Sequence, residues 1–147
     1  MRITLCGSIA FYDEMLRVKT QLEEAGYEVK LPPFEIKNDK GEMISVKKYY
    51  EMRKMETSDT SWIWDQKARS IHEHFDKITW SDAILVTNYD KKGIVGYIGG
   101  NTLMEMGLAF HLGKKIYLLN QMPEMQYKEE IIGLRPKVIF GDLSKIK

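Results

Sequence analysis

The chain has 147 residues, of which 44% are hydrophobic and 29% charged, a balance that fits one folded domain and excludes a disordered chain. The net charge is +1, and Lys and Arg are scattered, which argues against the concentrated basic face that a nucleic-acid partner requires. No apolar stretch reaches the roughly 18–20 residues of a membrane helix and no signal-peptide pattern is present, so we expect a cytoplasmic protein without a membrane partner.

The first part of the chain predicts a strand–helix–strand unit. Residues 2–6 form a β-favouring run, residues 11–25 carry apolar side chains at helical spacing, and residues 27–31 alternate like a second strand. Cys6, the only cysteine, excludes an intrachain disulfide and fits a buried, inert thiol.

The middle of the chain predicts a loop over residues 34–44, with a turn at 38–41, and helices near 45–56 and 61–80. Residues 34–60 are interpreted as an insertion within the domain. The three tryptophans of this region, Trp62, Trp64 and Trp80, are expected to lie in the core.

The last part continues the alternation of strands and helices. It predicts a strand at 82–88, a Gly-rich loop, a helix from 101 or 102 to 112, a strand at 115–119, a short helix at 124–132 and a strand at 137–140. We therefore expect an α/β fold: a single doubly wound domain over residues 1–147, with a five-stranded parallel sheet in the flavodoxin-like order 2-1-3-4-5.

In that order a ligand binds beyond the carboxyl ends of the first and third strands. The loops there, 7–9 and 89–101, are rich in glycine. Gly7-Ser8 suits an anion, although it equally fits a turn in which Ser8 caps a helix. The candidate ligand-binding residues near this point are Gly7, Ser8, Tyr12, Asn88, Asp90, Gly99, Gly100, Asn101 and Thr102.

Glu105 is a lone carboxylate in an otherwise apolar helical segment. One interpretation is a capping box, in which Thr102 and Glu105 satisfy the helix N-terminus. The other is a partly desolvated glutamate that faces the crevice and acts as nucleophile or base.

The helix before the third strand offers polar residues at 72–76. His72 and Asp76 share a face, but no third ligand stands at a suitable spacing, so we assign no metal site and no cofactor. Asp82, at the amino end of its strand, is expected to be structural.

The chain resembles the nucleoside 2-deoxyribosyltransferase family, which includes nucleotide N-glycosidases. The resemblance rests on Gly7-Ser8 after a strand, on the segments 81–86 and 113–116, and above all on the T-x-x-E-x-G-x-A string at 102–109. It implies that Glu105 attacks C1′ of a nucleoside or nucleoside 5′-monophosphate and forms a glycosyl-enzyme ester. It also implies a small-molecule nucleoside or nucleotide partner and a homo-oligomer, since a neighbouring subunit often completes the pocket in this family.

The sequence departs from the family pattern near the expected nucleophile. Gly99 stands where the transferases carry an acidic residue, Asn101 where they carry glycine, and His74 where an aspartate is expected. His74, Asp76 or Asp90 is left as a candidate proton donor. Hydrolysis or nucleotide binding tolerates these departures better than transfer does.

Three hypotheses follow. The first is an N-glycosidase or deoxyribosyltransferase that acts through Glu105. The second is a non-catalytic nucleotide sensor or an NAD-cleaving relative on the same fold. The third is a structural or interaction protein in which Glu105 is only a cap.

Overall fold

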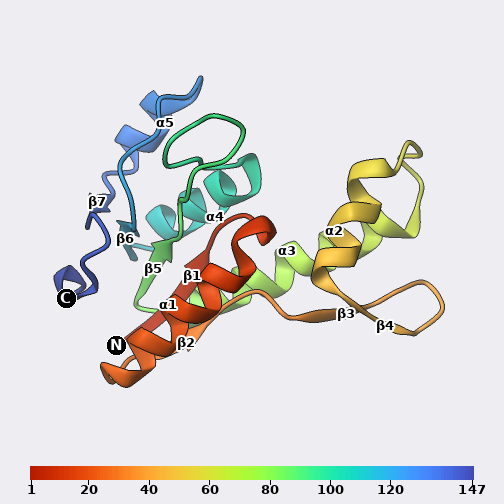
Figure 1. Cartoon of the computed structure of the whole chain (residues 1–147), viewed down its shortest axis with the longest axis horizontal. Helices are drawn as coiled ribbons and strands as arrows, with labels where there is room; N and C mark the ends of the chain where they lie inside the picture. Colours follow the sequence, from red (N-terminus) through yellow and green to blue (C-terminus); the bar gives the residue numbers. More distant parts are fainter.

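Five short strands form the parallel sheet at the centre of the computed structural model, which describes residues 1–147 (Figure 1). The strands are β1 (Arg2–Cys6), β2 (Glu28–Lys30), β5 (Ala83–Val86), β6 (Lys115–Leu118) and β7 (Lys137–Val138). Their order is β2-β1-β5-β6-β7, and each neighbouring pair is parallel. This order confirms the predicted arrangement, in which the winding reverses between β1 and β5.

Alternate residues of each strand face opposite sides of the sheet and build two cores. Ile3 and Leu5 point into a cluster formed with α1 (Tyr12–Glu24). Cys6 and Ile84 point into a second cluster. Three helices cover that second side: α3 (Trp62–Trp80), α4 (Gly100–His111) and α5 (Lys128–Gly133).

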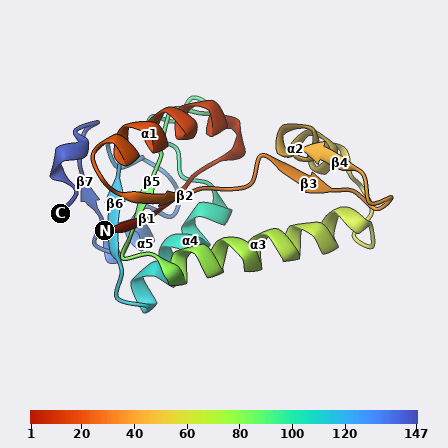
Figure 2. The ribbon, with the colours of Figure 1, turned by 90° about the horizontal axis from the view of Figure 1, so that it is seen from below.

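Residues 34–60, which the sequence suggested as an insertion, fold into a small lobe. It contains β3 (Glu35–Lys37), β4 (Met43–Ser45) and α2 (Val46–Met55), which lie beside the sheet on the extended amino half of α3 (Figure 2). A small cluster of Ile36, Tyr49 and Ile63 holds the lobe on the helix.

The prediction of a loop over 34–44 was wrong, because β3 and β4 pair as an antiparallel hairpin. The turn itself was predicted correctly. The Asn38 side chain accepts hydrogen bonds from the amides of Lys40 and Glu42, and Gly41 takes a φ of +77°. Strands of three residues are too short to give a readable alternation, so the sequence showed only the turn.

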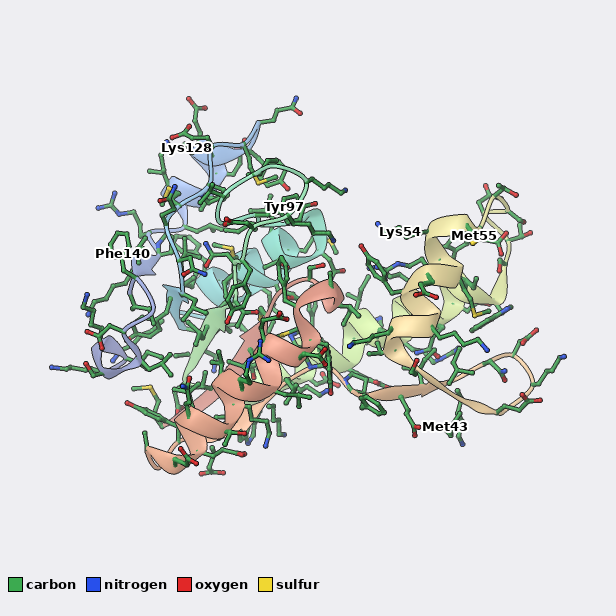
Figure 3. The ribbon with its side chains drawn as sticks, viewed as in Figure 1. Met43, Lys54, Met55, Tyr97, Lys128 and Phe140 are labelled. Atoms are coloured by element: carbon green, nitrogen blue, oxygen red, sulfur yellow. The ribbon has the colours of Figure 1, made fainter.

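Two 3-10 helices, η1 (Ile9–Phe11) and η2 (Leu143–Lys145), complete the elements. None of the helices is both long and apolar enough to cross a bilayer. Met43 and Met55 are exposed on the lobe (Figure 3). The homo-oligomer that the resemblance implies stays a prediction.

The Gly-rich loop after β5 is anchored by buried Asn88. Its side-chain amide donates to the main-chain oxygens of Gly96, Asn120 and Gln121, and its Oδ1 accepts from the Asn120 amide. Gly96 has a φ of +69°, and a Cβ there would lie 2.2 Å from the Gln121 oxygen. This close approach fixes the path of the loop toward α4.

We therefore expect Gly96→Ala to destabilise the protein by at least about 2 kcal/mol more than Gly93→Ala. Gly93 is the matched control, because its φ is +72° but nothing lies within 4 Å of an added Cβ. Both variants carry the cost of a left-handed alanine, and only the first adds the clash. Equal losses in chemical denaturation would show that the contact with Gln121 does not hold the loop.

Candidate active site

A cavity of about 380 Å³ opens where β1 and β5 end, within the range of small-molecule sites. The sheet side contributes Gly7 and Ser8 from the loop after β1. Helix α3 contributes one face, which includes Lys67 and His74, and Glu105 lies on α4. Helix α2 of the lobe supplies a further wall, so the cavity lies between the lobe and the sheet.

Glu105 is buried, and its position in the helix explains why. Helix α4 begins at Gly100 with Gly99 as N-cap, and no side chain makes a capping bond. The capping-box interpretation was therefore wrong, because the helix begins earlier than predicted and Glu105 falls in its second turn. The carboxylate instead turns toward the sheet, where Asn101 donates to its Oε1 at 2.8 Å.

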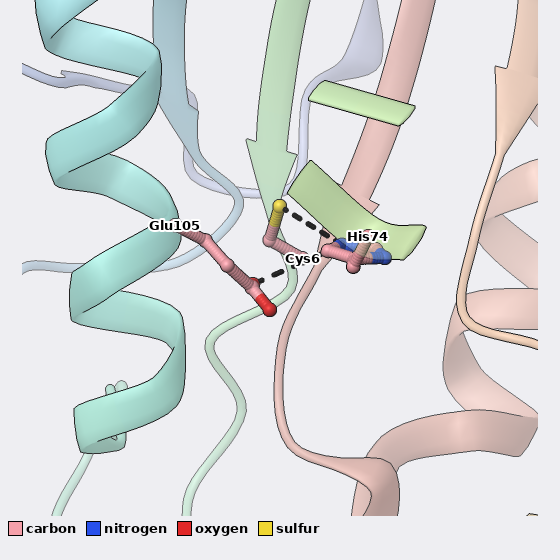
Figure 4. Close-up of side chains that lie close together, drawn as sticks. All are labelled: Cys6, His74 and Glu105. Carbon is pink, nitrogen blue, oxygen red and sulfur yellow. Dashed lines mark hydrogen bonds and ion pairs between the residues drawn. The ribbon is translucent and has the colours of Figure 1, made fainter. Parts of the chain in front are cut away.

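Three buried polar side chains meet beside the carboxyl end of β1 (Figure 4). His74 Nε2 lies 3.5 Å from Cys6 Sγ and 3.8 Å from Glu105 Oε2. The His74 and Glu105 side chains are each only 7% exposed. Glu105 Oε2 and His74 Nδ1 have no hydrogen-bond partner in the chain.

Burial sets the ionisation of this cluster. Desolvation raises the pKa of Glu105 to about 8, against the smaller lowering effects of the Cys6 thiol and the charge of Lys67. Desolvation and then the charge of Lys77 lower the pKa of His74 to about 4, although the Leu5 main chain partly offsets this. Desolvation also raises the pKa of the Cys6 thiol well above its usual value. The neutral forms of all three groups therefore dominate at pH 7.

Most of the residues proposed from the sequence are brought together here. The cavity is lined by Gly7, Ser8, His74, Gly99, Gly100, Asn101, Thr102 and Glu105. Ser8 also caps η1, since its hydroxyl accepts from the Ala10 amide. Ser8 therefore caps the helix and lines the cavity at the same time.

Four proposed residues do not line the cavity. Asp76 is exposed, because two residues along a helix turn the side chain by about 200° from that of His74. Tyr12 is buried and donates to the Pro32 oxygen. Asn88 anchors the Gly-rich loop, and Asp90 accepts from the Gly96 amide.

The structure also tests the structural roles expected for Asp82 and for the tryptophans. Asp82 pairs with Arg2 at the amino end of the sheet, as expected for a structural residue. Trp64 is not a core residue: it is partly exposed and lines the cavity. Trp80 is also only partly buried, with the Lys30 ammonium 4.1 Å from its ring centre.

The sequence did not predict the positive charge of the cavity wall. Five cations line it, against the two carboxylates Glu73 and Glu105, and none of the five forms a salt bridge. These cations are Arg53, Lys54, Lys67, Lys77 and Lys91. Two of them lie on α2, two on α3 and Lys91 on the loop after β5, and only tertiary packing brings them together.

Lys91 joins the lobe to the sheet domain across the cavity. Its ammonium donates to Ser8 Oγ and to the Tyr50 hydroxyl, both at 2.9 Å. The Lys91 ammonium also lies 5.4 Å from the ring centre of Tyr97, a residue of the same Gly-rich loop. Lys54 extends from α2 toward this loop (Figure 3). The hydrogen-bond partners of Lys91 are neutral, so its charge is available to an anion.

Comparison with known proteins supports the fold. No family model matches the sequence, and no curated protein matches it. A 2-deoxyribosyltransferase from Bacillus psychrosaccharolyticus superimposes with a TM-score of 0.50 and 18% identity, over 80% of this chain and 71% of that one. A CMP N-glycosidase from Clostridium botulinum superimposes with a TM-score of 0.48 and 22% identity, over 95% and 86%. The chain therefore has a 2-deoxyribosyltransferase-like fold in a divergent form.

The raised pKa of Glu105 has a measurable consequence for stability. A carboxyl group with a pKa of about 8 in the folded state and about 4.3 unfolded favours folding only while it is protonated. Its contribution to the free energy of unfolding is complete below pH 4 and is lost as the pH rises toward 8. Glu105→Gln, which stays neutral, is expected to gain about 2–4 kcal/mol over the wild type between pH 5 and pH 8.

Urea denaturation at the two pH values measures this difference. Glu73→Gln is the matched control, because its carboxyl group lies in solvent at the rim of the same cavity. A stability difference between Glu105→Gln and the wild type that is the same at both pH values would instead show that folding does not shift the pKa of Glu105.

Proposed function

We propose that this protein hydrolyses the N-glycosidic bond of a nucleoside 5′-monophosphate, with Glu105 as the nucleophile. The observation that carries the proposal is a buried carboxylate with one free oxygen in the wall of a cavity lined by unpaired cations. The likeness in fold agrees with this chemistry, but the argument rests on the site itself.

The reaction takes place in two displacements at C1′ of the sugar. A Glu105 carboxylate oxygen bonds to C1′ while the C1′–N bond breaks. The electron pair of the broken bond leaves with the base, which takes up a proton from solvent. Water then attacks C1′, the ester bond breaks, and the electron pair returns to the carboxylate while the proton of water passes to solvent. Two inversions give a sugar phosphate of retained configuration.

The surroundings of Glu105 prepare it for this step. Asn101 holds Oε1, which leaves Oε2 as the free oxygen. Loss of water around the carboxylate strengthens its attraction to the positive charge that develops at C1′. Asn101 and Gly99 occupy positions where the transferases carry other residues, which supports hydrolysis over transfer to a second base.

The cationic wall supports a phosphorylated substrate. Lys91 beside Ser8 can donate to phosphate oxygens, and Arg53 and Lys54 extend the positive charge along α2. The rings of Tyr50 and Tyr97 lie in the same cavity and can stack on a sugar or base. An uncharged nucleoside would bring no negative charge to these cations.

One observation favours a second function, a non-catalytic nucleotide sensor. With a pKa of about 8, only about one tenth of Glu105 is ionised at pH 7. A neutral acid is a poor nucleophile. The sensor would bind the nucleotide through the same cations and release it intact.

The first test is chromatographic detection of free base from nucleosides, their 5′-monophosphates and NAD. We expect release from a monophosphate that Glu105→Ala lowers at least 1,000-fold, as the loss of a nucleophile does. Because only the carboxylate attacks, kcat/KM should rise about tenfold per pH unit between pH 5 and 7. A nucleotide that raises the Tm and stays intact would identify the sensor instead.

The role of Lys91 in binding the phosphate can be tested separately. Lys91→Ala should raise KM for the monophosphate at least tenfold and leave KM for the matching nucleoside within about twofold. Lys48→Ala is the charge-matched control, because Lys48 is exposed and does not line the cavity. Equal effects of Lys91→Ala on both substrates would place the phosphate elsewhere.

A further inference from the structure

Three metal-binding side chains of different kinds lie close together, each from a different element: Cys6, His74 and Glu105. They come from β1, α3 and α4, and their donor atoms all lie within 4.8 Å of one another. We propose that Cys6 Sγ, His74 Nε2 and Glu105 Oε2 bind a zinc-like divalent ion beside the cavity. Thiolate, imidazole and carboxylate are ligands that zinc takes in proteins.

The spacing of the donors fits a tetrahedral ion. Usual zinc bond lengths place a sulfur and a nitrogen ligand about 3.5 Å apart, and a nitrogen and an oxygen about 3.4 Å apart. The corresponding distances here are 3.5 Å from Cys6 to His74 and 3.8 Å from His74 to Glu105. The third pair, Cys6 and Glu105, has its donor atoms within 4.8 Å, so a turn of the Glu105 carboxylate toward the thiol closes the site.

The unsatisfied carboxyl oxygen of the cluster points to the same ligand. Glu105 Oε2 is buried with no hydrogen-bond partner, which is costly for a carboxyl oxygen. A cation between Oε2, the imidazole and the thiolate would satisfy it. Asn101 holds the other carboxylate oxygen, as an outer partner of a metal ligand commonly does.

The site is reachable and leaves one coordination position open. Glu105 and His74 line the cavity, whereas Cys6 lies behind them. Three protein ligands leave the fourth position of a tetrahedral ion for water or a ligand from the cavity.

The metal and the proposed reaction compete for one oxygen. This consequence rests on the proposed function, although the binding of metal does not. If Oε2 bonds to the ion it cannot attack C1′, so the metal-bound protein is an inhibited form.

Titration of the reduced protein with Co²⁺, a coloured substitute for zinc, tests the site. Because Cys6 is the only cysteine, any thiolate-to-cobalt absorption must come from it. We expect one equivalent of Co²⁺ to give this absorption together with the visible bands of tetrahedral cobalt, and Zn²⁺ to displace it. Cys6→Ser should lose the thiolate absorption, and Glu105→Gln should weaken Co²⁺ binding at least tenfold.

His72→Ala is the matched control, because His72 is exposed on the same helix, and its spectrum should be unchanged. Folded wild type without thiolate–cobalt absorption would overturn the proposal. So would an absorption that Glu105→Gln and His74→Ala both leave unchanged, since the thiol would then bind alone.

A kinetic measurement separates this proposal from the proposed function. Zinc should suppress base release by the wild type and a chelator should restore it. Cys6→Ala, compared with its own chelated rate, should need at least tenfold more zinc for the same suppression. If no nucleotide is cleaved, the glycosidase is wrong while the cobalt spectrum still decides the metal site.

Discussion

The parallel pairing of β1 with β5 is the constraint on which the site depends. The register places Cys6 beside Val86, so the loops after both strands leave the sheet at the same edge. Parallel strands need crossover connections, and the connection from β2 to β5 carries the lobe and the long helix α3. This connection brings α2 and α3 beside the carboxyl end of β1 (Figure 2). His74 of α3 and the cations of α2 therefore line the same cavity.

The buried carboxylate of Glu105 opposes folding when it is ionised. Removing water from a carboxylate raises its pKa and destabilises the charged form. The charge of Lys67 and the amide of Asn101 offset only part of this cost. A cationic centre, either the sugar at C1′ or a metal ion, would stabilise the charged form, and this links the two proposals through one oxygen atom.

The sheet was predictable because strand-like and helical segments alternate along most of the chain, and the rules for connecting parallel strands then allow few topologies. Glu105 stood out as the one carboxylate in an apolar helix. Of the two interpretations left open for it, the capping box is excluded because α4 begins at Gly100, and glycine gives no helical signal. Burial of Cys6 was expected, but its contact with His74 and Glu105 depends on tertiary packing across distant segments. The cations of α2 were missed for that reason too.

The central claim, that Glu105 forms a covalent bond to C1′, is tested most directly by mass spectrometry of acid-quenched protein during turnover. The account predicts a sugar-phosphate adduct on the peptide that contains Glu105, absent from Glu105→Gln, and a product of retained configuration. Turnover that gives an inverted product, with no adduct at any quench time, would contradict it, because water would then attack C1′ directly.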